Sequence, residues 1–223
     1  MTISENINRI KADLPETVKL IAVSKRQPDE KLQEAIDCGH LVYGENIVQE
    51  LVRKEAIFPK NIEWHMIGHL QRNKVKYIAP FISYIHSVDG ESLLNEIQKR
   101  AAQNNRKIHC LFEVHIAKED SKFGWQPSDL ETFLNNINFA QYPNIIFAGL
   151  MGMATNTSDT TQIEQEFHFL KTFFDKLNTT VFAKNTDFKE LSMGMSGDYP
   201  LAVKHGSTMI RVGTAIFGQR FSK

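Results

Sequence analysis

Short apolar runs rich in β-branched residues recur along the chain, and segments with helical spacing of apolar residues separate them. Each run is too short for a helix of ordinary length and is mostly apolar on both faces, as strands buried in a parallel sheet are. The runs that we interpret as strands cover residues 19–24, 41–45, 63–68, 84–89, 108–116, 145–153, 190–195 and 208–218.

The segments between these runs carry apolar stripes typical of amphipathic helices. In "DEKLQEAIDC" (29–38), Leu32, Ala35 and Ile36 share one face, and "ENIVQELVRKEAI" (45–57) repeats the pattern. A helix or helix-like segment follows each of the first seven strands. Strict alternation of strand and helix predicts a parallel sheet.

Eight such units in a chain of 223 residues favour a single (β/α)₈ barrel of the TIM type over an open doubly wound sheet. We find no linker or low-complexity stretch, so one domain over residues 1–223 is expected. Only "QRFSK" (219–223) follows the last strand, which is too short for an eighth helix. We therefore expect the helical pattern of residues 3–14 to cover that gap.

Composition and charge exclude several classes of protein. Lys plus Arg and Asp plus Glu both number 26, without the one-signed excess typical of nucleic-acid or membrane-surface binders. Cys38 and Cys110 are far apart and predict reduced thiols. No segment has the apolar length of a signal peptide core or a membrane span. We expect a cytoplasmic protein with no nucleic-acid or membrane partner.

Candidate chemistry lies at the carboxyl ends of the strands, where barrels of this type place their active sites. After the seventh strand, "SMGMSGD" (192–198) offers serines and glycines, and "RVGT" (211–214) offers a glycine and a hydroxyl one strand further. Each segment alone is an ordinary turn composition. Together, at the two strand ends where barrels often bind phosphate, they favour a phosphate site.

Two basic residues accompany this predicted phosphate site. Arg211 lies within an apolar strand, where it either reaches the rim or pairs with a nearby carboxylate, or else donates into the barrel mouth. Lys25 follows the first strand, where a lysine is commonly just the first solvated residue. At a barrel mouth, beside a cationic arginine, its pKa would fall and its amine would form Schiff bases with carbonyls. Amine, phosphate cradle and arginine together describe a pyridoxal phosphate (PLP) site.

Other polar residues give weaker signals. Asn46 is placed to cap the helix that follows it. His65 and His69 of "HMIGH" have the spacing of a metal pair, but that spacing puts both rings on one face only in a helix. We interpret both as structural histidines and predict no metal site.

Several motifs resemble the pyridoxal phosphate homeostasis protein family from about residue 18 to residue 220. They are "AVSK", "YGEN", "WHMIGHLQRNK", "IHSVD", "LMGM" and "LSMGMSGDYPLAVKHGSTMIRVGTAIFG". The resemblance implies the barrel of alanine racemase, a type III PLP fold, with PLP held as an aldimine on Lys25. It implies that the phosphate is held by Ser192, Gly194, Gly213 and Thr214, that Arg211 faces the pyridine nitrogen and that Asn46 lies beside the ring. The family often has a lysine at the position of Lys122, to which no role is given.

The resemblance leaves a non-catalytic PLP carrier and a racemase-like PLP enzyme as alternatives. Racemisation needs two bases on opposite faces of the substrate carbon, and alanine racemase takes one from a partner subunit in a dimer completed by an extra β-domain. We expect that domain to be absent here, and so predict a carrier for vitamin B6 homeostasis with no catalytic residues. PLP-dependent apoenzymes or B6-metabolising enzymes are candidate partners of an expected monomer. A class I aldolase ranks last because its lysine normally lies on a late strand.

Overall fold

The computed structural model describes residues 1–119 and 123–219, and within these ranges eight parallel strands close into a barrel in sequence order. The strands are β1 (Lys19–Val23), β2 (Val42–Glu45), β3 (Glu63–Met66), β4 (Tyr84–Val88), β5 (Ile108–Val114), β6 (Ile145–Gly152), β7 (Glu190–Met195) and β8 (Met209–Val212). Strands β1 and β8 pair from Lys19–Met209 to Ala22–Val212 and so close the ring. The closed parallel barrel confirms the predicted fold class.

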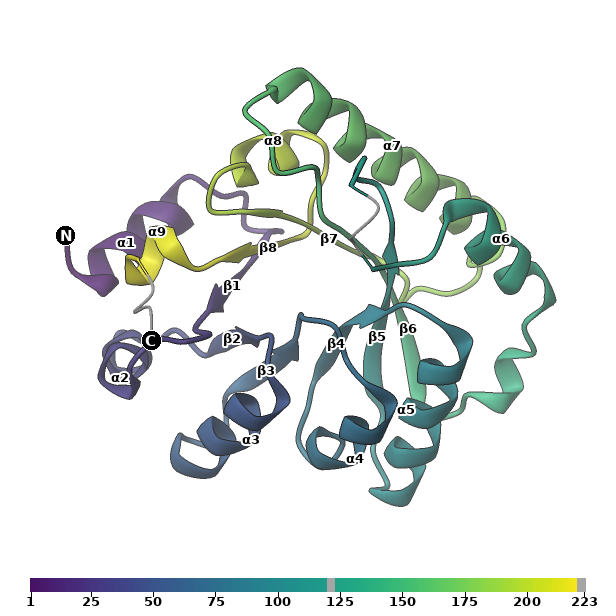
Figure 1. The fold of residues 1–223 in the computed structure, drawn as a ribbon, viewed down its shortest axis with the longest axis horizontal. Helices are drawn as coiled ribbons and strands as arrows, with labels where there is room; N and C mark the ends of the chain where they lie inside the picture. The colour runs from purple at the N-terminus through teal and green to yellow at the C-terminus, as the bar shows by residue number, and fades with distance from the viewer. Residues whose placement is uncertain (120–122, 220–223) are drawn as a thin grey trace.

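Helices surround the ring of strands (Figure 1). They are α1 (Ile3–Ala12), α2 (Asp29–Asp37), α3 (Val48–Ile57), α4 (Val75–Ile78), α5 (Glu91–Gln103), α6 (Pro127–Asn136), α7 (Thr160–Thr179), α8 (Tyr199–Lys204) and α9 (Thr214–Phe217), with 3₁₀ turns at Arg72–Lys74 and Phe139–Gln141. Among the described residues, no helix has the length and apolar character needed to cross a membrane.

The apolar core has two parts because the strands are buried on both faces. The larger part lies between the outer face of the barrel and the helices. The smaller part fills the barrel interior and is formed by Ile21, Tyr84, Leu111, Ala148, Met151 and Met209. Polar side chains share this interior, and they reach across it between strands that are not neighbours.

The carboxyl end of the chain differs from the prediction. The expected strand over residues 208–218 is wrong in its second half, because β8 ends at Val212 and residues Thr214–Phe217 form the short helix α9. Ile216 and Phe217 belong to α9, and their side chains are buried there. Their apolar character therefore reflects burial of this helix and does not mark a continued strand. Helix α1 lies beside α9 (Figure 1), where Asn6 Nδ2 donates to Ile216 O at 3.0 Å. The amino-terminal helix therefore covers this side of the barrel, as expected.

Candidate functional site

Closure of the barrel brings Lys25 to the loop that follows β8. Ala22 pairs with Val212, so the two strands end side by side at the same rim. A Cβ atom on Gly213 would lie 3.1 Å from Val23 O, so the "VGT" turn packs directly against the end of β1. Lys25, two residues beyond Val23, is half-buried at this rim. The amine and the predicted phosphate loop therefore lie on neighbouring strand ends.

A tight turn carries Lys25. Gln27 N donates to Ser24 O at 3.1 Å, and Arg26 takes the left-handed conformation with φ of 56°. That conformation is uncommon for a residue with a side chain. The Arg26 N–H donates to Glu50 Oε1 at 2.8 Å, so helix α3 holds the turn that carries Lys25.

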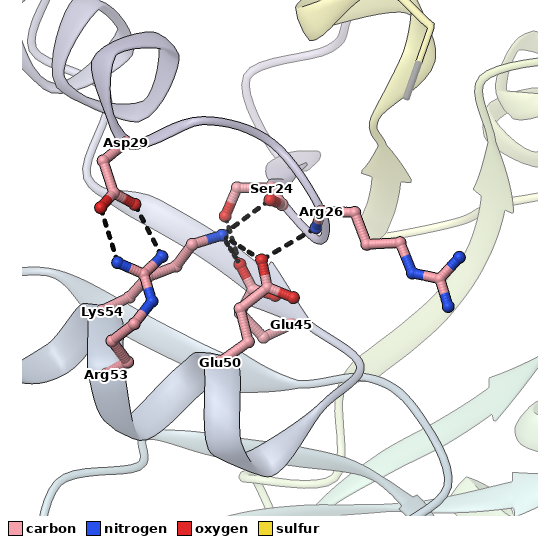
Figure 2. Close-up of polar contacts among 7 residues, drawn as sticks. All are labelled: Ser24, Arg26, Asp29, Glu45, Glu50, Arg53 and Lys54. Atoms are coloured by element: carbon pink, nitrogen blue, oxygen red, sulfur yellow. Dashed lines mark hydrogen bonds and ion pairs between the residues drawn. The ribbon is translucent and has the colours of Figure 1, made fainter. Parts of the chain in front are cut away.

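A buried ion cluster also holds this turn (Figure 2). The Lys54 ammonium, whose side chain is fully buried, donates to Ser24 O at 2.7 Å. It also donates to Glu45 Oε1 at 2.7 Å and to Glu50 Oε1 at 2.8 Å, which uses all three of its hydrogens. Ser24 Oγ donates to Glu45 Oε1 at 2.5 Å. Burial raises the pKa of Glu45, and the charge of Lys54 opposes that rise.

Two backbone amides at the start of α9 converge on one oxygen. Gly213 N and Ala215 N donate to Ser196 Oγ at 3.2 and 3.3 Å. Gly194 lies two residues before this serine with φ of 94°, and a Cβ there would lie 2.6 Å from the Cβ of Ala202. Glycine is therefore required for β7 to approach helix α8. The two amides point at one oxygen atom, an arrangement suited to binding an oxyanion.

Arg211 points into the barrel and not to the rim. It is 4% exposed, and its Nη1 donates to Ser192 Oγ at 2.6 Å while Nη2 donates to Gly152 O at 3.1 Å. Burial lowers its pKa to about 10, against the opposing charges of Asp198 and Glu113. The side chain is therefore a cation at neutral pH, held by neutral acceptors within the barrel.

The two serines of "SMGMSGD" occupy different places. Ser192 is fully buried, and its hydroxyl contacts both Arg211 and His86 Nδ1, the latter at 2.9 Å. Ser196 is the serine beside the Gly213 amide. Sequence reasoning selected Ser192 and passed over Ser196, although both lie in one motif. The signal that separates them is position, because Ser196 follows the last residue of β7.

Asn46 does not cap helix α3, which corrects the expectation from its sequence position. The residue in the N-cap position is Ile47, with an extended backbone and no side-chain cap. Asn46 Oδ1 is buried and has no hydrogen-bond partner among the described residues. A Cβ on Gly68 would lie 2.7 Å from Asn46 Cα, so this glycine leaves space for Asn46 at the rim. A buried acceptor without a partner is costly unless a ligand supplies a donor.

Glu113 of β5 is a candidate residue of the functional site that the sequence did not reveal. It is 3% exposed, and burial raises its pKa to about 7, with the charge of Asp89 adding to the rise and Arg211 opposing it. Its Oε2 has no hydrogen-bond partner in residues 1–119 and 123–219. Lys122, noted from the resemblance, lies outside the described residues.

The two histidines of "HMIGH" have separate partners. His65 is fully buried and contacts His86 and Glu63, whereas His69 Nδ1 lies 3.0 Å from Asp89 Oδ2 at the other end of the strand. No cluster of three or more His, Cys, Asp or Glu side chains suited to a metal occurs in the described part of the chain. The structural interpretation of both histidines agrees with these contacts.

Comparison with known proteins first defines the class. The family model for the alanine racemase N-terminal domain matches residues 1–221. Alanine racemase from Bartonella henselae superposes with a TM-score of 0.73 at 14% identity, covering 98% of this chain and 58% of that one. At that identity the likeness shows the barrel fold alone.

More similar proteins then identify the family. The pyridoxal phosphate homeostasis protein of Aquifex aeolicus is 39% identical over 203 residues, which cover 91% of this chain and 87% of that protein. The Escherichia coli K12 protein of the same name is 34% identical and covers 92% and 87%. PipY of Synechococcus elongatus with PLP bound has a TM-score of 0.88 at 35% identity, covering 97% and 100%. The chain belongs to the pyridoxal phosphate homeostasis protein family.

Proposed function

We propose that this protein binds PLP covalently through Lys25 at the barrel mouth and serves cofactor homeostasis without efficient turnover. The observation that carries the proposal is the packing of the Gly213 turn, with its two converging amides, against the end of the strand that leads to Lys25. An amine and an oxyanion site on adjacent strand ends match the aldehyde and phosphate of one PLP molecule. The names of the relatives, which refer to homeostasis of the cofactor, agree with this function.

The residues at the rim fit the cofactor. We assign its phosphate to the backbone of Gly194, Gly213 and Thr214, with the hydroxyl of Ser196 replacing that of Ser192. The hydroxyl of Ser192 is already engaged by Arg211 and His86. We assign Asn46 to the ring, because its buried Oδ1 has no partner in the described ranges.

Arg211 limits the chemistry available at this site. When bound, PLP supplies an aldehyde that reacts with amines and a ring that withdraws electrons. The withdrawal is strongest when the ring nitrogen is protonated. A buried arginine that stays cationic at neutral pH disfavours a second positive charge beside it. The site therefore favours holding the cofactor over stabilising a substrate carbanion.

Borohydride trapping tests the cofactor assignment. We expect purified protein incubated with PLP to turn yellow, and borohydride to fix a pyridoxyl group on the peptide that contains Lys25. Lys25→Ala should lose the covalent label, whereas Lys60→Ala, which removes a surface lysine paired with Glu55, should keep it. Covalent label retained by Lys25→Ala would disprove the assignment.

Deuterium exchange separates the carrier from a racemase-like enzyme. Exchange of the Cα proton of amino acids in deuterated water should be far slower than about 1 s⁻¹, the lower end of ordinary turnover. Exchange at or above that rate would replace the carrier proposal with the racemase alternative.

The proposal includes a cytoplasmic, monomeric protein that exchanges PLP with apoenzymes or with enzymes of vitamin B6 metabolism. Size-exclusion chromatography with light scattering tests the monomer. Transfer of PLP from the loaded protein to an apoenzyme, followed by recovery of that enzyme's activity, tests the exchange.

A further inference from the structure

A continuous line of polar side chains joins Arg211 to the opposite end of the barrel. It begins at Glu63, the first residue of β3, whose Oε1 accepts a hydrogen bond from Lys19 Nζ at 2.7 Å. The successive distances are 2.8 Å from Glu63 Oε1 to His65 Nε2, 2.8 Å from His65 Nδ1 to His86 Nε2, 2.9 Å from His86 Nδ1 to Ser192 Oγ and 2.6 Å from Ser192 Oγ to Arg211 Nη1. We call these side chains, from Glu63 to Ser192, the histidine chain.

The Glu63 end of the histidine chain fixes the direction of its hydrogen bonds. A guanidinium can only donate, so Ser192 Oγ accepts from Arg211 and keeps its own hydrogen and a second lone pair for His86 Nδ1. At the other end, burial opposes ionisation of Glu63, but hydrogen bonds from His65 and Lys19 lower its pKa to about 2. Glu63 is then a carboxylate that can only accept, so His65 Nε2 carries a hydrogen.

The middle of the chain has one arrangement that satisfies both ends. A neutral imidazole has one donor and one acceptor nitrogen. With its hydrogen on Nε2, His65 accepts at Nδ1, and His86 Nε2 must donate to it. His86 Nδ1 is then an acceptor, so Ser192 Oγ donates its hydrogen to it. Every hydrogen in the chain points from Arg211 toward Glu63.

Burial supports neutral imidazoles. Both rings are fully buried, and burial lowers the pKa of His65 and His86, with the charges of Arg211 and Lys19 adding to the effect at His86. The His65 ring also stacks on Tyr84 with centroids 4.5 Å apart and planes 8° apart. Rotating the ring out of this plane would break the stack and two hydrogen bonds at once.

We propose that the histidine chain holds the Arg211 guanidinium in place from the amino-terminal end of the barrel, which makes Glu63, His65 and His86 positioning residues for the PLP site. The inference rests on the proposed function, in which Arg211 faces the ring nitrogen. Because the hydrogen of Ser192 is engaged by His86, its lone pairs face Arg211. Reversing the His86–Ser192 link would free the hydroxyl hydrogen and leave one lone pair of Ser192 for Arg211, which would loosen the hold on the guanidinium.

Nitrogen-15 NMR of the histidine side chains tests the chain without cofactor. In PLP-free protein at pH 7, we expect His65 and His86 to be neutral, with the hydrogen on Nε2 and a bare Nδ1. Assignment follows from His65→Gln and His86→Gln. An imidazolium at either position, or a hydrogen on Nδ1 of His86, would overturn the proposal.

Substitution of Glu63 tests the effect on the distant site. Glu63→Leu removes the terminal acceptor and should weaken PLP binding about tenfold, the effect of losing one hydrogen bond to a charged group, and shift the absorption maximum of the bound cofactor. Glu63→Gln retains an acceptor oxygen and should recover part of the affinity. Glu190→Leu is the matched control, because Glu190 begins β7 and binds Thr208 instead of the chain. It should bind PLP as the native protein does.

The outcomes separate the two proposals. A Glu63→Leu protein with native affinity and spectrum would overturn the positioning role. If that variant does not fold, Glu63→Gln decides, because its amide can donate or accept. We then expect any second tautomer at His65 to be accompanied by weaker PLP binding, and a second tautomer with native affinity and spectrum would contradict the proposal. A native protein that binds no PLP would refute the proposed function and leave the NMR result standing.

Discussion

Two buried polar networks serve this barrel, and they solve the problem of burying polar groups in different ways. Behind the Lys25 turn, Lys54 meets Glu45 and Glu50, so formal charges are buried together. Inside the barrel, the histidine chain connects charged ends through imidazoles that we expect to be neutral. The ion cluster holds backbone atoms, namely Ser24 O and Arg26 N, whereas the chain fixes the direction of hydrogen bonds. Buried charges are suited to holding backbone atoms, and imidazole tautomers are suited to fixing the direction of hydrogen bonds.

The largest expected effect comes from breaking the ion cluster. Lys54→Met leaves Glu45 and Glu50 close together without their cation, and should lower the free energy of unfolding by about 3–5 kcal/mol. Urea denaturation measures this change in the free energy of unfolding. Lys60→Met, which breaks an exposed pair with Glu55, should cost no more than about 1 kcal/mol. Equal effects in the two variants would show that the cluster holds nothing in place.

Acidification should act on the histidine chain, alongside His40 and His109, whose pKa values burial also lowers. His65 and His86 are held neutral in the fold, whereas unfolded histidines bind protons as the pH falls through 6.5. The unfolded state then binds more protons, so stability is highest above pH 6.5 and falls with acid. Well below that pH, each buried imidazole costs about 1.4 kcal/mol per pH unit, or about 2.7 for the two.

Denaturant midpoints measured between neutral pH and mild acid give this slope. His86→Phe should reduce it by about half of that contribution, while His168→Ala, at an exposed position, should leave it unchanged. A His86→Phe protein with the native slope would show that His86 does not carry the acid sensitivity.

The smallest effect is expected at the outer edge of the ion cluster. Arg53 and Asp29 form a bidentate pair with distances of 2.6 and 2.7 Å, but both side chains are partly exposed (Figure 2). Arg53→Ala should therefore lower the free energy of unfolding by less than about 1 kcal/mol in urea denaturation. A loss as large as that of Lys54→Met would mean that the outer pair and the buried cluster act as one unit.

Much of the fold was predictable because buried parallel strands impose apolar runs on both faces. The end of β8 was not, because the run continues through Ile216 and Phe217, which are buried by helix α9. Asn46 is of a residue type that often caps helices, but the helix begins later, at Val48. Local composition does not say where a chain turns from strand to helix when apolar burial continues across the boundary.

Parts of the candidate site were also predictable from the sequence, and other parts were not. The rim positions of Lys25, Gly213 and Thr214 follow from counting strands, since the carboxyl ends of parallel strands meet at one edge. The choice between Ser192 and Ser196 does not, because the sequence does not show that β7 ends at Met195 and leaves Ser196 beyond the strand. The role of Lys54 is also invisible in the sequence, where it reads as one more solvated lysine of an amphipathic helix.

The sequence by itself determined the barrel, the strand ends that carry polar residues, and the family to which the motifs belong. Only the tertiary structure decided which side chains meet across the interior. His86 and Ser192 are 106 positions apart on strands that are not neighbours, and closure of the ring alone brings them within 2.9 Å. Periodicity reports which face of an element is buried, because burial is a property of one residue. A hydrogen-bond chain is a property of several strands at once, and it exists only after the barrel has closed.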